Sequence, residues 1–116
     1  MANYSVIACL STYPPRECGI ATFSRDLMAA YNNLYLPRAE MRVVAMQAPD
    51  AKLRYPKNLL GIIEHNNPAS YAKIAKKLNR DKRVKLVNIQ HEFGIFGGVW
   101  GEYVEIFLKE LNKPAV

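Results

Sequence analysis

The sequence places a histidine and a carboxylate side by side, His91 and Glu92, after an apolar segment and ahead of three glycines. An imidazole can donate a hydrogen bond to a sugar hydroxyl or shuttle a proton near neutral pH, and a carboxylate can orient either partner. Gly97 and Gly98 would let this loop wrap a ligand closely. The alternative is a histidine satisfied by backbone carbonyls beside a flexible turn, and spacing alone leaves both interpretations open.

A second candidate is the turn at Cys18 and Gly19, which precedes the first predicted helix. Glycine allows a ligand to approach the backbone, and the N–H groups of Ile20, Ala21 and Thr22 would point from the helix end toward a phosphate. The turn matches neither the dinucleotide-binding fingerprint nor the P-loop. Gly19 could equally serve a tight turn that needs its dihedral angles.

No further chemistry is predicted for His65 or for the thiols of Cys9 and Cys18. Cys9 lies within an apolar segment and is expected in the core, and Cys18 has no base near it in the sequence. His65 falls in a polar loop, where we expect it to be solvated. These residues and His91 lack the paired spacing of zinc ligands, so no metal site is predicted.

Segments of strand and helix character alternate along the chain. This order predicts an α/β fold, with a parallel sheet and helices on both faces. The expected strands cover residues 5–10, 41–47, 59–63 and 84–90, and the expected helices cover 20–34, a segment that starts at Pro68 with Asn67 as its cap, and 99–111. Ligands bind outside the carboxyl ends of parallel strands, and both candidate loops follow such ends.

Apolar residues three or four apart predict the buried face of each helix. For the first helix they are Ile20, Phe23, Leu27, Tyr31 and Leu34. For the second they are Tyr71, Ile74 and Leu78. For the last they are Trp100, Tyr103, Val104, Phe107 and Leu111, which we interpret as core and not as a cofactor site.

The charge of the chain is concentrated in one segment. The 116 residues carry a net charge of +6, and residues 73–85 supply all of it. Its basic residues are Lys73, Lys76, Lys77, Arg80, Lys82, Arg83 and Lys85. A solvated helix face is the simplest interpretation, and contact with an anionic membrane is the next. No motif for nucleic acid accompanies the charge, so nucleic acid is not an expected partner.

The composition predicts one globular domain. Half of the residues are apolar and 22% are charged, which supports a core and argues against disorder. The uninterrupted apolar runs reach only five residues, too short for a transmembrane helix or a signal peptide. A cytoplasmic protein with reduced thiols is therefore expected, with the inner face of the membrane as the one alternative.

Two motifs carry a family resemblance. Residues 12–23 (TYPPRECGIATF) and 90–98 (QHEFGIFGG) resemble the N-terminal half of retaining glycosyltransferases of family 4, the "glycosyl transferase group 1" enzymes of the GT-B fold. The resemblance covers nearly the whole chain. It implies a Rossmann-like acceptor-side domain of an enzyme that moves a sugar from a nucleotide-sugar to an acceptor hydroxyl, on a sugar, a glycan or a lipid-linked molecule.

The resemblance also implies roles for single residues. Gly19 lies where the family approaches the donor diphosphate and sugar, although Cys18 stands where many members have a second glycine. His91 corresponds to a histidine near the donor sugar, and Glu92 follows it as in several members. The resemblance implies no bound metal or other cofactor.

The activity of this chain alone, and whether it is part of a longer protein, remain open. The domain that carries the family's paired glutamates and diphosphate-binding cations is absent from this sequence, so the chain alone is expected to be inactive. Residues 114–116 read as the start of another buried strand, which predicts an N-terminal fragment of a longer protein. The alternatives are a free-standing flavodoxin-like or nucleotide-binding module without catalysis, and an inactive truncated fragment.

Overall fold

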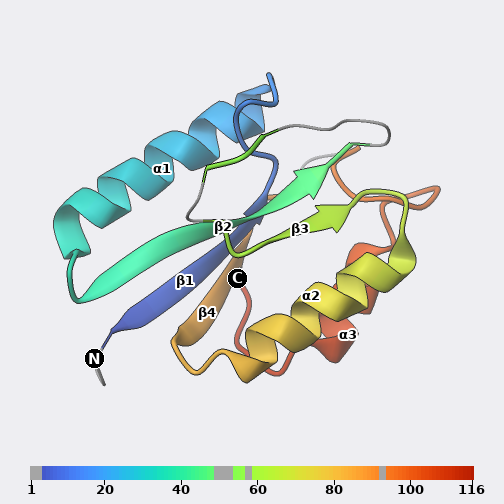
Figure 1. Cartoon of the computed structure of the whole chain (residues 1–116). Coiled ribbons are helices and arrows are strands. Elements are labelled where there is room, and N and C mark those ends of the chain that lie inside the picture. The colour runs from blue at the N-terminus through green and yellow to red at the C-terminus, as the bar shows by residue number, and fades with distance from the viewer. Residues whose placement is uncertain (1–3, 49–53, 57–58, 92–93) are drawn as a thin grey trace.

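A computed structural model describes residues 4–48, 54–56, 59–91 and 94–116 of the chain. Within them lies a four-stranded sheet of β1 (Ser5–Ser11), β2 (Ala39–Gln47), β3 (Gly61–Glu64) and β4 (Val84–Ile89). The strands are all parallel, in the order β3-β2-β1-β4 (Figure 1). The predicted α/β, Rossmann-like fold is confirmed.

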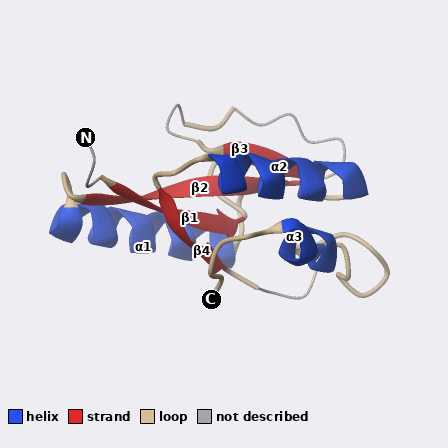
Figure 2. Cartoon of the chain, turned by 90° about the horizontal axis from the view of Figure 1, so that it is seen from below, coloured by secondary structure: helices blue, strands red, loops and turns tan. Residues whose placement is uncertain are grey.

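Helices cover both faces of this sheet. α1 (Gly19–Tyr35) lies above it in Figure 1, and α2 (Pro68–Arg80) and α3 (Val104–Glu110) lie below it. Seen from below, α2 overlaps β2 and β3, and α3 lies beside α2 (Figure 2). Side chains of β1 alternate between the two cores, because successive residues of a strand point to opposite faces. Leu10 belongs to the core under α2 and α3, whereas Cys9 packs under α1.

α1 turns a different face to the sheet from the one predicted. Its buried residues are Ala21, Ser24 and Met28, while Phe23 is 54% exposed and Leu34 is 71% exposed. The reason is close packing, since the Ser24 hydroxyl lies 2.6 Å from that of Ser11 on β1. Small side chains let the helix approach the strand. Three residues of the predicted stripe still pack beside the two cores, namely Ile20, Leu27 and Tyr31.

α2 begins and packs as predicted. The Asn67 side chain accepts a hydrogen bond from the Ala69 N–H at 3.1 Å, and Pro68 takes the first helical position. Tyr71, Ile74 and Leu78 are buried against the sheet.

α3 begins five residues later than predicted. Gly98 and Gly101 have φ angles of +96° and +81°, outside the helical region. The Glu102 carboxylate accepts hydrogen bonds from the N–H groups of Val99 and Trp100 at 3.2 and 2.7 Å, which closes a turn in place of a first helical turn. Trp100 is therefore 80% exposed, and its prediction as core is wrong.

Residues 114–116 run alongside β4. Val87 forms a parallel bridge with Ala115, its N–H donating to the Pro114 carbonyl and its carbonyl accepting from the Val116 N–H, each at 2.9 Å. Extended structure thus begins where the sequence predicts a strand.

Candidate functional site

The carboxyl ends of β1 and β4 meet at the point where the strand order reverses. From β1 the chain moves to β2 and β3 on one side, then returns through α2 to β4 on the other. Leu10 pairs with Ile89, and the Gln90 N–H donates to the Leu10 carbonyl at 3.0 Å. Such a switch point is the usual ligand crevice of an open parallel sheet. Both candidate loops, residues 12–18 and 90–98, start beside each other here.

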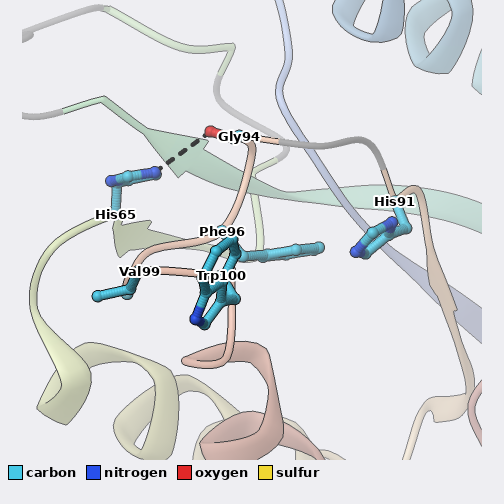
Figure 3. A pocket seen from close by; sticks show the side chains of 8 residues that line it. His65, His91, Gly94, Phe96, Val99 and Trp100 are labelled. Atoms are coloured by element: carbon cyan, nitrogen blue, oxygen red, sulfur yellow. Dashed lines mark hydrogen bonds between the residues drawn. The ribbon is translucent and has the colours of Figure 1, made fainter.

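A pocket of about 130 Å³ lies beside this crevice, built from the loops that follow β3 and β4 (Figure 3). Its wall combines imidazole, aromatic and glycine residues. The lining residues are His65, His91, Gly94, Phe96, Gly98, Val99, Trp100 and Gly101.

His91 is exposed at the mouth of this pocket. The centre of its ring lies 5.6 Å from that of Phe96, with 34° between the ring planes, and Phe96 points toward it (Figure 3). Within the described part of the chain the imidazole has no hydrogen-bond partner, so no backbone carbonyl there satisfies it. Its nitrogens are therefore unpaired within these residues, and the predicted role of His91 remains a prediction.

Two large apolar side chains project at the same place. Val99 is 78% exposed and Trp100 is 80% exposed, because the Glu102-capped turn presents them to solvent. An exposed indole can stack on the apolar face of a ligand ring, and the imidazoles beside it can hydrogen-bond hydroxyl groups at the edge of that ring.

His65 lines the pocket although the sequence placed it in a solvated loop. Its Nε2 lies 3.3 Å from the Gly94 carbonyl oxygen (Figure 3). Its Nδ1 lies 2.8 Å from Asn66 Oδ1. The signal that could have found it is its position directly after β3, at the same carboxyl edge as His91.

The Tyr71 hydroxyl holds the two pocket loops together. It donates to the His65 carbonyl at 2.9 Å and accepts from the Gly97 N–H at 2.9 Å. The Tyr71 side chain is fully buried, and this burial raises its pKa, against the smaller opposing effect of the Gly97 hydrogen bond. The hydroxyl therefore stays protonated at neutral pH and bridges both loops.

Internal contacts account for glycine at positions 97 and 98. A Cβ on Gly97 would collide with the His65 carbonyl oxygen and approach Tyr103 Cδ2 to 2.8 Å. Gly98 has a left-handed φ and a Cβ there would collide with the Glu102 carboxylate. Gly98 also lines the pocket, whereas Gly97 is buried. Their predicted ligand contact remains a prediction.

Gly19 has no such internal cause. It is exposed, its φ is not left-handed, and an added Cβ would meet nothing within 4 Å. The tight-turn interpretation therefore does not explain this glycine. The open space in front of it is compatible with a ligand that approaches the start of α1.

Cys18 caps α1 with its sulfur atom. Its Sγ accepts from the Ala21 N–H at 3.4 Å and lies 3.1 Å from the Thr12 hydroxyl oxygen, while its carbonyl accepts from the Thr22 N–H at 3.2 Å. The expectation that the Ala21 and Thr22 N–H groups face an anion is thus wrong. Gly19 and Ile20 precede them, in the turn where helix N–H groups lack intrahelical partners.

Three further predictions concern Glu92, a metal site and a membrane-spanning helix. Glu92 lies outside the described residues. In the part of the chain that the structure describes, no three potential metal ligands cluster and no helix is long and apolar enough to cross a membrane.

The basic segment is partly structural. The Lys77 ammonium donates to the Leu60 carbonyl at 2.7 Å, and Arg83 pairs with Asp81 at 2.7 Å. The pKa of Asp81 is lowered, chiefly by its hydrogen bond with Arg83. The other basic residues of the segment are exposed, namely Lys73, Lys76, Arg80, Lys82 and Lys85.

Models of protein families, curated proteins and solved structures give no match to the chain. Among the described residues, the carboxyl edge of the sheet carries an imidazole without a hydrogen-bond partner, an exposed indole and an open helix start. Together these groups can bind a polar ring that carries an anionic substituent.

Proposed function

We propose that the chain is the acceptor-side part of a retaining glycosyltransferase, which moves a sugar from a nucleotide-sugar to an acceptor hydroxyl. The observation that carries the proposal is the imidazole of His91, unpaired within the described residues, in an aromatic pocket at the same carboxyl edge of the sheet as the open start of α1. A nucleotide-sugar has the matching parts, a hydroxylated ring joined to a diphosphate.

Each part of the site then has a chemical role. His91 would hydrogen-bond a hydroxyl of the transferred sugar, and Trp100 would stack on a sugar ring of the acceptor. The diphosphate would lie in front of Gly19, where the dipole of α1 stabilises the negative charge that develops as this group departs. Glu92 would orient a hydroxyl or the imidazole. Metal and other cofactors are not required by these roles.

A nucleotide-binding module without catalysis is the alternative function. The switch-point crevice and the start of α1 support it equally, because both suit a phosphate. It differs in the use of the pocket, since such a module needs no sugar contact from His91.

Calorimetric titration of the chain with nucleotide-sugars and with the corresponding nucleoside diphosphates tests the proposal. We expect the sugar to increase affinity, and His91→Ala to remove that increase while leaving the diphosphate affinity unchanged. Gly19→Ala should weaken both ligands, because its methyl group would occupy the space in front of the helix. Arg38→Gln, at the opposite edge of the sheet, is the control.

The outcomes separate the two functions. Equal affinities for the nucleotide and the nucleotide-sugar, unaffected by His91→Ala, would favour the binding module. No binding of either class would overturn both.

Contact with an anionic membrane through residues 73–85 is a separate proposal. The exposed lysines and arginines of this segment support it, since juxtaposed cations add about 1 kcal/mol each at an anionic surface. Sedimentation with phosphatidylglycerol vesicles, with Lys73 and Lys76 changed to Gln, tests it. Binding by the chain that these changes leave intact would refute the assignment.

A further inference from the structure

Two buried polar atoms on the other side of the crevice lack partners. Within the described residues, Arg16 Nη1 and the Tyr55 hydroxyl are shielded from solvent and form no hydrogen bond. Arg16 belongs to the loop that follows β1, and Tyr55 to the connection between β2 and β3. Both loops leave the carboxyl ends of neighbouring strands.

The two side chains lie within electrostatic reach of each other, since the charge of Arg16 acts on the Tyr55 hydroxyl. Burial raises the pKa of the Tyr55 hydroxyl, and the positive charge of Arg16 acts against that rise. Tyr13 and Leu59, in the same two loops, pack against the core under α1. The pair therefore sits on the α1 side of the sheet, whereas the pocket of His65 and His91 follows β3 and β4.

No carboxylate balances Arg16 in the described structure. The ion pairs there are Arg25–Asp26, Arg42–Glu40 and Arg83–Asp81, and none includes Arg16. Arg16 as a residue is half-buried, but its Nη1 is shielded from water and gains no hydrogen-bond partner, which costs free energy. The unpaired Nη1 of Arg16 can donate to an anion that the described residues do not supply.

We propose that Arg16 and Tyr55 form a phosphoryl-binding clamp. The planar guanidinium matches phosphate oxygens through parallel N–H donors, and the Tyr55 hydroxyl donates a further hydrogen bond. The phosphoryl group belongs either to a diphosphate or to a phosphate monoester on a sugar. The clamp does not depend on sugar transfer and stands even if His91 has no role.

NMR titration of the isotope-labelled chain with inorganic pyrophosphate and with glucose 6-phosphate tests the clamp and separates these two sources. We expect saturable binding of at least one, with the largest shifts at the Arg16 Nε–H group and at neighbouring amides. Arg16→Gln should weaken binding about tenfold or more, and Tyr55→Phe about fivefold, as loss of a charged and a neutral hydrogen bond implies.

Matched variants make the result specific. Arg38→Gln removes the same charge from an exposed site beyond the far edge of the sheet and should leave binding unchanged. His91→Ala should also leave pyrophosphate binding unchanged, which distinguishes the clamp from the sugar site. Arg16→Lys keeps the charge without the fork and should still weaken binding.

Three results would overturn the clamp. They are the absence of saturable binding, an equal loss with Arg38→Gln, and unchanged affinity in a folded Arg16→Gln variant. Should Arg16→Gln fail to fold, unchanged binding by Tyr55→Phe and Arg16→Lys would overturn it in the same way.

Discussion

Changing Tyr71 to Phe tests how the pocket is built. The substitution keeps the buried ring but removes the hydroxyl that donates to the His65 carbonyl and accepts from the Gly97 N–H, both at 2.9 Å. The His65 carbonyl lies in a half-buried residue, where water can replace the lost donor. The Gly97 N–H is buried and would stay unpaired.

The expected loss of stability follows from these two bonds. A net hydrogen bond contributes about 1 kcal/mol, and an unpaired buried group costs about 1–3 kcal/mol, so we expect the free energy of unfolding to fall by about 2–4 kcal/mol. Urea denaturation of the whole chain measures it. Amide hydrogen exchange should show the largest loss of protection at Gly97, because the bridge between the loops is broken there.

A matched variant isolates the bridge from the loss of a hydroxyl in general. Tyr35 is 46% exposed, so Tyr35→Phe should change the free energy of unfolding by less than about 0.5 kcal/mol. If Tyr71→Phe were as mild as Tyr35→Phe, with protection at Gly97 intact, the hydroxyl bridge would not hold the pocket loops.

The remaining predictions concern two glycines, a helix cap and a buried thiol. Gly97→Ala should destabilise the chain by about 1–3 kcal/mol because its methyl group meets backbone, whereas Gly19→Ala should be neutral or stabilising by up to about 1 kcal/mol; thermal unfolding compares them. Asn67→Ala should cost about 1 kcal/mol in urea denaturation through loss of the α2 cap, and an unchanged midpoint would contradict this. Burial raises the pKa of Cys9 from 9.0 to about 11, so its protonated form favours the folded state and stability should fall by about 2–3 kcal/mol as pH rises from 9 to 11. Cys9→Ala should lack that part of the slope, and equal slopes for the two proteins would refute the cause.

The sequence predicted the fold well where local signals and tertiary packing agree. Alternating segments gave the parallel sheet, and the Asn67-Pro68 pair marked the start of α2 to the residue. The prediction from sequence failed where tertiary packing decides which face of helix α1 is buried. The large residues Phe23 and Leu34 fit a helical stripe, but the contact between Ser11 and Ser24 needs a face of small residues.

The sequence predicted at which edge of the sheet the candidate site lies, but it did not predict the pocket there. The rule that ligands bind at carboxyl ends of strands identified the loops of Gly19 and His91. It applies equally to His65, which follows β3, yet nothing in the local sequence marks that residue. The exposure of Trp100 depends on left-handed glycines and a Glu102-capped turn, features that periodicity does not reveal.

The most direct test of the proposed function is to locate a bound nucleotide-sugar on the chain. Amide chemical shifts of the labelled chain, followed during titration with a panel of nucleotide-sugars, would map the contact. We predict shifts at Gly19 and Ile20, at His91 and in residues 94–101, with the indole N–H of Trp100 also affected. Saturable binding whose shifts all lie elsewhere, or no binding by any member of the panel, would contradict a donor site at the ends of β1 and β4.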